Sequence, residues 1–432
     1  MKINSLPLLF VRLFALLWFV SPVTWATDNQ WTYSGLQGSS VNALVIDTRN
    51  PATLYVGASN EGYGSGVFKS NDAGKSWNAA NKGLINTIGK VPSVYKIVID
   101  LFNPDTLYAG TDAGIYKSTD GGGSWHPVSP EVYVNILTIT SSNPSTLYGT
   151  TSDSWAYKSS NGGGSWSQTT VYNPSYFGMS FGVPLIYGMT INPSNPTMLY
   201  LGIGGAYAGI VPGWGGILKS TDGGGSWHIT GPNDTVTTLA IVASNPSTIY
   251  AGVGFITTGG SLYKSTDGGE NWSLLNARLG VNTLVIDPYN PTTLYAGAAN
   301  GVYKSIDGGV NWSYFNTGLL GQSINALAID PSNSATLYVG TTYGVSKLTS
   351  AKSTISPIDC LFNWAEKNYP ALFAPAGSST VVWNIYKYRY YSATNTYLGL
   401  ALTDYHVYYM GPDGILQDEG PASYWLPLAG CQ

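Results

Sequence analysis

The sequence predicts an all-β protein built from a repeated unit of four strands, and three observations point to this fold. The chain of 432 residues is rich in Gly (53) and Tyr (32), and only 10% of its residues are charged, too few for coiled coils or helical bundles. A twelve-residue block that resembles a pair of strands recurs seven times. A nine-residue block follows six of these seven copies. Repetition at this spacing is typical of proteins that stack one supersecondary unit many times.

The charge pattern argues against one class of partner. Nineteen basic and 23 acidic residues give a net charge of -4, and Lys and Arg do not cluster anywhere in the chain. Because nucleic-acid binding depends on a concentrated basic surface, we expect no nucleic-acid partner.

Each twelve-residue block contains an apolar run, a turn of the Asn-Pro type and a second apolar run that ends in Tyr. The first copy is LVIDTRNPATLY. The seven copies end at Tyr55, Tyr108, Tyr148, Tyr200, Tyr250, Tyr295 and Tyr338. Two β-like runs separated by turn residues predict that each block forms a hairpin of two strands.

The nine-residue block predicts a second hairpin in the same unit. Its first copy, KSNDAGKSW, spans Lys69–Trp77. The Asp position holds Asp72, Asp120, Asn161, Asp222, Asp267 and Asp307, and the Trp position holds Trp77, Trp125, Trp166, Trp227, Trp272 and Trp312. A short polar side chain can accept backbone N–H bonds across a tight turn, and Gly adopts backbone conformations closed to other residues. We therefore expect this block to join the third strand to the fourth, with its Trp at the start of the fourth.

Four antiparallel strands in each of seven units predict a seven-bladed β-propeller over residues 27–350. The seventh unit lacks the nine-residue block. The missing strand stands at the other end of the chain, where Trp31-Thr32-Tyr33 precedes the first unit as Trp312-Ser313-Tyr314 precedes the last. We expect the N-terminal strand to complete the last blade and close the ring, since a closed ring has no exposed sheet edge.

The nine-residue block resembles the Asp-box, or BNR, repeat through its pattern Ser-x-Asp-x-Gly-x-x-Trp, and the resemblance covers residues 31–349. In the sialidases and sortilin-like receptors that carry this box, it is structural and lies away from the ligand site. The resemblance implies the same structural role here. Equivalent copies spread around a ring also favour turn formation over catalysis or metal binding for the Asp residues.

The N-terminus predicts export. Lys2 begins a basic start, a short apolar run follows Arg12, and Ala26 offers a small residue for cleavage, so residues 1–26 are expected to be a signal peptide. The apolar run is too short to span a bilayer comfortably, although an uncleaved anchor is the alternative.

Residues 351–432 depart from the repeat and predict a small α+β domain. Ser356-Pro357 is typical of a helix start, a short segment at 423–426 suggests a second helix, and β-like runs cover 381–391, 396–402 and 406–410. Cys360 and Cys431, an even count in an exported chain, are expected to form a disulfide. The segments 368–375, 388–397 and 411–414 resemble a C-terminal appendage of varied exported proteobacterial proteins.

Loops that exceed their repeat equivalents all fall on one face of the predicted ring, opposite the boxes. They cover 60–66, 78–91, 169–185, 203–215 and 252–260. Extra loop length serves something other than the fold. The candidate ligand-binding residues are the aromatic side chains Tyr172, Tyr176, Phe177, Tyr207, Trp214 and Phe255. Such side chains suit sugar rings or apolar peptide groups, and the alternative is that they pack among themselves.

If the protein is an enzyme, the candidate catalytic residues are Asp112, Glu131 and Asp153, from adjacent blades of the same face. A glycoside hydrolase needs two carboxylates facing one another across a pocket, and Asp112 lies in a minimal turn. Resemblance argues against catalysis: sialidases use three arginines, whereas this propeller contains only Arg49 and Arg278. The first repeat also lacks the acidic residue of xyloglucanase-like propellers, and we find no arginine patch like that of the photosystem II assembly factors with this box.

We therefore expect an exported, non-catalytic recognition or scaffold protein. It is expected to bind a glycan or an extracytoplasmic protein through the long-loop face, with glycan hydrolysis as the alternative. We expect a monomer without a cofactor or a metal, since two Cys and the three His (His126, His228 and His406) show no metal-ligand spacing. A hydrolase predicts an acidic pocket at the mouth of the ring, and a binding protein predicts an aromatic surface there.

Overall fold

The structure is a computed structural model in which the chain divides into two compact units, Met1–Ser350 and Ala351–Gln432. The residues described in the first unit are 30–59, 65–129, 132–140, 146–151, 155–169, 185–204, 215–253, 260–276, 279–319 and 321–349. In the second unit they are those of five strands between 378 and 421.

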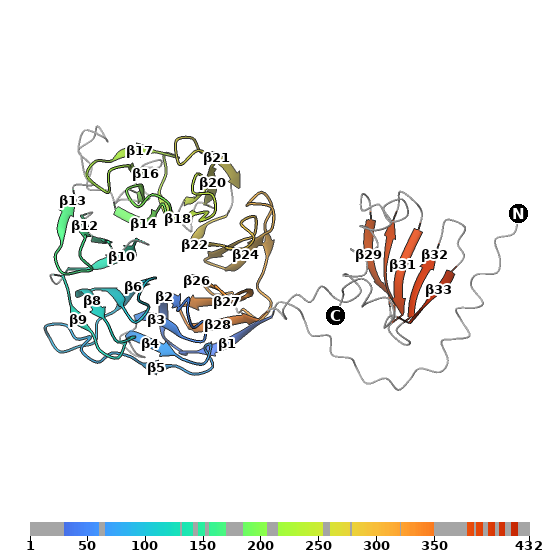
Figure 1. Cartoon of the computed structure of the whole chain (residues 1–432), viewed down its shortest axis with the longest axis horizontal. Coiled ribbons are helices and arrows are strands. Elements are labelled where there is room, and N and C mark those ends of the chain that lie inside the picture. The colour runs from blue at the N-terminus through green and yellow to red at the C-terminus, as the bar shows by residue number, and fades with distance from the viewer. Residues whose placement is uncertain are drawn as a thin grey trace, which may run out of the picture. The chain divides into compact units, whose positions relative to one another are not determined.

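The described part of the first unit forms seven four-stranded antiparallel sheets arranged as a ring of blades (Figure 1). The innermost strands are β2 (Ser40–Ile46), β6 (Val94–Ile99), β10 (Val134–Ile139), β14 (Leu185–Ile191), β18 (Val236–Ile241), β22 (Val281–Ile286) and β26 (Ile324–Asp330). Each contacts the innermost strands of the two adjacent blades, and β26 contacts β2, so the predicted seven-bladed ring is confirmed.

The twelve-residue blocks form the first and second strands, as predicted. The second strands are β3 (Leu54–Ser59), β7 (Leu107–Thr111), β11 (Leu147–Thr151), β15 (Leu199–Gly204), β19 (Ile249–Val253), β23 (Leu294–Ala298) and β27 (Asn333–Thr341). They are almost wholly buried because neighbouring blades cover both of their faces. The fit is close: a Cβ added at Gly57 of β3 would lie 2.5 Å from Val94 Cγ1 of the next blade, so only glycine allows this approach.

The nine-residue blocks connect the third and fourth strands. The third strands are β4 (Gly66–Ser70), β8 (Gly114–Ser118), β12 (Ala156–Ser159), β16 (Gly215–Ser220), β20 (Ser261–Ser265), β24 (Gly301–Ser305) and β28 (Gly344–Thr349). The fourth strands are short: β5 (Asn78–Ala79), β9 (His126–Pro127), β13 (Ser167–Thr169), β17 (His228–Thr230), β21 (Ser273–Asn276) and β25 (Ser313–Tyr314).

The fourth strand of the seventh blade is β1 (Trp31–Gly35), which confirms closure of the ring by the N-terminal strand. It pairs antiparallel with β28, with Trp31 opposite Leu348 and Tyr33 opposite Ser346. Trp31 is buried, and its Nε1 donates a hydrogen bond to Phe315 O of blade six at 2.7 Å. The first and last strands of the ring therefore lie side by side.

The described part of the second unit is a five-stranded antiparallel sheet in sequence order. Its strands are β29 (Ser378–Trp383), β30 (Tyr386–Tyr391), β31 (Thr396–Ala401), β32 (His406–Met410) and β33 (Leu416–Pro421). The β-like run predicted at 381–391 is divided between two strands, because Trp383 pairs with Tyr386 and the chain folds back as a hairpin. The fifth strand was not predicted. Both predicted helices, Cys360 and Cys431 lie outside the described residues.

Candidate functional site

The box carboxylates are held by their own turns. In the first box, Asp72 Oδ1 accepts hydrogen bonds from Ser70 Oγ at 2.8 Å and from the Ser76 backbone N–H at 2.9 Å. Asp72 Oδ2 accepts a bond from Ser76 Oγ at 2.5 Å, and the Gly74 N–H donates to Ser70 Oγ. Each carboxylate oxygen is therefore occupied within the turn.

These hydrogen bonds favour the ionised carboxylate and lower its pKa. The side-chain bond from Ser76 is the main cause for Asp72 and that from Ser124 for Asp120, and each pKa falls to about 2. The backbone bond from Asn311 is the main cause for Asp307, whose pKa also falls to about 2. The pKa values of Asp222 and Asp267 are lowered in the same way. A group that stays ionised at neutral pH is a poor general acid, so this geometry supports a structural role.

The third box shows that the turn does not need a charge. Asn161 Oδ1 accepts hydrogen bonds from the Ser165 N–H at 2.8 Å and from Ser159 Oγ at 2.9 Å. Its Nδ2 donates to Ser165 Oγ at 2.9 Å. The amide thus reproduces the contacts that the carboxylates make in the other boxes.

The boxes also tie the blades together through what we call the Tyr–Lys latch, the final Tyr of a twelve-residue block and the first Lys of the nine-residue block in the same blade. Both donate to one carbonyl in the box of the next blade, at 2.8–3.1 Å. The acceptor is Gly121 for Tyr55 and Lys69, Gly162 for Tyr108 and Lys117, Gly223 for Tyr148 and Lys158, and Ala73 for Tyr338 and Lys347. Polar repeat residues are thereby used in contacts between blades.

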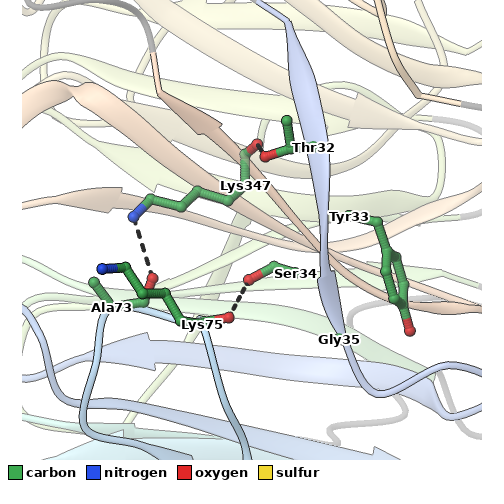
Figure 2. A pocket seen from close by; sticks show the side chains of 8 residues that line it. Thr32, Tyr33, Ser34, Gly35, Ala73, Lys75 and Lys347 are labelled. Carbon is green, nitrogen blue, oxygen red and sulfur yellow. Dashed lines mark hydrogen bonds between the residues drawn. The ribbon is translucent and has the colours of Figure 1, made fainter.

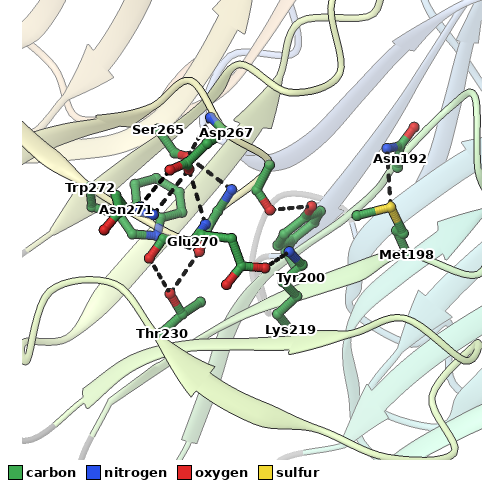
Figure 3. Close-up of polar contacts among 12 residues, drawn as sticks. Asn192, Met198, Tyr200, Lys219, Thr230, Ser265, Asp267, Glu270, Asn271 and Trp272 are labelled. Atoms are coloured by element: carbon green, nitrogen blue, oxygen red, sulfur yellow. Dashed lines mark hydrogen bonds and ion pairs between the residues drawn. The ribbon is translucent and has the colours of Figure 1, made fainter.

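Three junctions differ. Between blades five and six, Tyr250 donates to Gly308 O at 3.1 Å, whereas Lys264 Nζ lies 5.3 Å from the Tyr250 ring centroid and, among the described residues, makes no hydrogen bond to that carbonyl. Between blades four and five, Tyr200 alone donates to Gly268 O, and Lys219 forms an ion pair with Glu270 instead (Figure 3). Between blades six and seven there is no box, and within the described residues the Tyr295 hydroxyl has no hydrogen-bond partner.

The box tryptophans also reach the preceding blade. Trp77, Trp125 and Trp166 donate from Nε1 to the carbonyls of Ser34, Ala80 and Val128 at 2.7–2.9 Å. Trp272 and Trp312 donate instead to Gly269 and Gly309 of their own boxes. The Nε1 of Trp227 is buried and has no partner among the described residues. His126 and His228, which follow box tryptophans, are exposed.

Most of the predicted site residues lie outside the described residues. This applies to the ligand-binding candidates Tyr172, Tyr176, Phe177, Tyr207, Trp214 and Phe255, and to the catalytic candidates Glu131 and Asp153. Asp112 is described: it is exposed at the tip of the β7–β8 turn, and its backbone N–H donates to Ser93 O at 3.2 Å. This position fits a turn residue.

One long loop of the predicted face is described, and it is a fixed projection. In this insert, residues 80–93, Leu84 is fully buried, and Ile85 O accepts a hydrogen bond from the Tyr116 hydroxyl at 2.8 Å. Asn86 Oδ1 accepts bonds from two backbone N–H groups of the insert, at residues 88 and 90. The aliphatic side chains here were not among the predicted contacts, which are all aromatic: Ile85 is 50% exposed and Ile88 74%.

The inner strands present a polar ring at the same face. Asn42, Asn135, Thr237 and Asn282 each donate to the backbone carbonyl of the next blade at Val94, Ile186, Val281 and Ile324. Blade two has Tyr95 at this position, and its ring lies 4.8 Å from that of Tyr133. Desolvation, then Tyr95 and Asp112, raise the pKa of Tyr133 to about 12.

Lys96 stands next to Tyr95 on the innermost strand of blade two. Among the residues of the seven inner strands, the other charged one is Asp330, at the far end of β26. The Lys96 side chain is accessible to solvent, yet the surrounding protein desolvates its ammonium and lowers its pKa. Tyr95, Tyr133 and Lys96 together give this edge of the ring aromatic surface and positive charge.

Comparison with known families identifies the repeat. The BNR/Asp-box repeat matches residues 263–274, which contain Asp267 and Trp272 of the fifth box. The chain is therefore a seven-bladed β-propeller that carries a BNR/Asp-box repeat. No curated protein matches it significantly.

Solved structures share the propeller fold at low identity. YCF48 from Cyanidioschyzon merolae is 14% identical with a TM-score of 0.56, covering 75% of this chain and 99% of its own. A structure of YCF48 bound to D1 peptide is 14% identical with a TM-score of 0.54, and the match covers 75% of this chain and 97% of that one. An ancestral GH74 enzyme is 18% identical with a TM-score of 0.59. The match covers 90% of this chain and 54% of the enzyme, so this chain spans about half of that enzyme's length. At such identities the likeness shows the fold alone. Among the described residues, no helix is long and apolar enough to cross a membrane.

Proposed function

We propose that this propeller is an exported, non-catalytic recognition protein that binds a glycan or an extracytoplasmic protein on the long-loop face. Export rests on the leader-like residues 1–26, and a disulfide between Cys360 and Cys431 belongs to the same proposal. The insert, residues 80–93, is the observation that carries it. Apolar side chains exposed on a fixed loop lose little entropy when a partner covers them.

Three further features support recognition on this face. Tyr133 is 37% exposed and backed by Tyr95, so its ring is an already ordered platform for a sugar or an apolar side chain. Lys96, the neighbour of Tyr95 on β6, adds a positive charge to this edge of the ring. The predicted aromatic contacts, with Tyr176 and Trp214 foremost, belong to the same proposal and lie outside the described residues. The neighbouring structure of YCF48 bound to D1 peptide is a precedent for a peptide on this fold.

The opposite face is less suited to the same task, because its boxes are engaged in turns and latches. Glycan hydrolysis is the second candidate, and it would require Asp112 to act with Glu131 or Asp153. The ancestral GH74 enzyme supports it through shared fold only. The exposed turn position of Asp112 weakens it, since a general acid needs burial to raise its pKa.

The test uses the full mature chain on a polysaccharide array and a peptide array, read for retention and for release of reducing ends. We expect retention without release, and at least a tenfold loss in Ile88→Ser or Tyr133→Ala. The matched control is Phe102→Ala, an aromatic that is 60% exposed in the Asn-Pro turn of the opposite face. Release of reducing ends that Asp112→Asn or Asp153→Asn abolishes would show hydrolysis instead, and equal retention by all variants would place the site elsewhere.

A further inference from the structure

A hollow lies on the box face, where the ring closes. It separates β1 of blade seven from the box of blade one and has a volume of about 350 Å³. We call it the closure cleft, lined by Thr32, Tyr33, Ser34, Gly35, Ala73, Gly74, Lys75 and Lys347 (Figure 2). Small-ligand pockets begin at about 300 Å³, so the volume admits a molecule the size of a sugar.

Two ammonium groups face this cleft. Lys347 and Lys75 extend on one side of β1, and Tyr33 extends on the other (Figure 2). Lys347 Nζ donates to Ala73 O at 3.1 Å as part of its latch. Desolvation is the main cause of the lowered pKa of Lys347; Lys75 lowers it further, whereas Asp330 and Asp72 oppose the shift. The two lysines are therefore close enough to repel one another.

Neither ammonium has a carboxylate partner among the described residues, where the ion pair within 4 Å is that of Lys219 and Glu270. Asp72, the nearest box carboxylate to Lys75 in sequence, has its oxygens bonded by Ser70 and Ser76. The cleft thus has two ammonium groups without carboxylate partners among the described residues, next to a hollow of about 350 Å³.

The other boxes show that Lys75 is not required by the fold. Its position holds Gly123, Gly164, Gly225, Glu270 and Val310 in blades two to six. In blade five this residue faces the latch lysine of the preceding blade, and Glu270 Oε1 meets Lys219 Nζ there (Figure 3). Blade one has a lysine in the place of that glutamate, which replaces an attractive pair by a repulsive one.

We propose that the closure cleft binds a small anionic ligand whose carboxylate or phosphate group bridges Lys75 and Lys347. The inference is independent of the proposed function, since it concerns the opposite face. Ammonium groups form charge-assisted hydrogen bonds to such oxyanions, and the anion would relieve the repulsion between the lysines. The Ser34 and Thr32 hydroxyls line the cleft beside them and can accept bonds from the hydroxyls of a sugar. A sugar acid or a sugar phosphate has the required charge and size.

The test is titration calorimetry of the full mature protein with glucuronate, glucose 6-phosphate, glucose and inorganic phosphate. We expect at least one of the two charged sugars to bind at low ionic strength and to weaken in 0.5 M salt, and glucose not to bind. The tighter of the two charged sugars identifies carboxylate or phosphate as the group. Binding of inorganic phosphate alone would overturn a sugar-sized ligand, and absence of binding by all four would overturn the site.

Lys75→Glu is the decisive variant, because it places a carboxylate opposite Lys347 as in the junction of Lys219 and Glu270. We expect at least a tenfold loss of anion affinity with a melting temperature equal to or above that of the parent. Lys82→Glu, in the insert, makes the same charge change away from the cleft and should keep the affinity. Equal affinity in Lys75→Glu would refute the site. Tyr133→Ala should keep anion binding, which separates this result from failure of the proposed function.

Discussion

At the scale of the residue, Asp120 shows how the box depends on pH. Its hydrogen bonds lower its pKa from the ordinary 3.8 to about 2 in the folded protein. A carboxylate whose pKa is lower in the folded state stabilises the fold above the ordinary pKa. That contribution is lost as the pH falls from about 4 through 2, because the unfolded chain then binds the proton more readily.

We predict that Asp120→Asn is less stable than the parent at pH 7 and that this difference disappears near pH 2. Asn161 shows that an amide fits the turn, so the variant should fold. The reverse change, Asn161→Asp, should raise the melting temperature at pH 7 and leave it unchanged near pH 2. Thermal melts at the two pH values measure both effects. A deficit for Asp120→Asn that stays constant with pH would contradict the role of ionisation.

The sequence predicted the box residues well because their contacts are local: Asp72 bonds residues two and four positions away. It could not predict the latch, since Tyr55 and Lys69 bond Gly121 in another blade. The sequence shows that the final Tyr and the first Lys recur in each unit. The carbonyl that both of them bind lies in the next blade, so it can be identified only once the blades are packed into a ring.

At the scale of the element, the latch is the polar contact that joins one blade to the next. The Tyr148 hydroxyl is buried and donates to Gly223 O at 3.1 Å, which also accepts from Lys158. Tyr295 occupies the same place at the junction where the next blade has no box. The chain therefore contains its own comparison between a latched and an unlatched tyrosine.

We predict that Tyr148→Phe lowers the free energy of unfolding by about 1 kcal/mol, the net value of one buried hydrogen bond. Tyr295→Phe should change it by much less, because within the described residues its hydroxyl has no acceptor to lose. Urea denaturation of both variants measures the difference. Equal losses would mean that the hydroxyl contributes through something other than the latch.

The sequence predicted the strands of each blade because the apolar runs and the turn residues between them recur at equivalent positions in all seven copies. It did not predict the extra residue of the inner strands, where the register shifts between Val94 and Lys96 and places Tyr95 at the edge of the ring. Nor did it single out the insert, since Ile85 and Ile88 carry no aromatic signal.

At the scale of the whole molecule, β1 closes the ring. Its removal would expose the edge of β28 and the surface that Trp31 covers. Unpaired strand edges are templates for association with other chains.

We predict that deletion of residues 27–40 causes aggregation, measured by light scattering and size-exclusion chromatography. Deletion of 27–29 alone keeps Trp31 and should leave a monodisperse protein. A soluble 27–40 deletion that melts like the parent would show that the ring does not depend on this strand.

The seven blades and their closure were predictable because repeats and the match of Trp31 to Trp312 determine them. The closure cleft was not, since Lys75 and Lys347 come from opposite ends of the propeller sequence and meet only when the ring closes. The second unit has no repeat to guide prediction, and its fifth strand was missed there.

Because β1 pairs with β28, the propeller is a closed ring, and the ring itself does not determine which blade comes first along the chain. If a box were built between residues 349 and 30, the seventh blade would gain the hairpin of the other six. New termini could then be opened in any Asn-Pro turn, because such surface turns tolerate circular permutation.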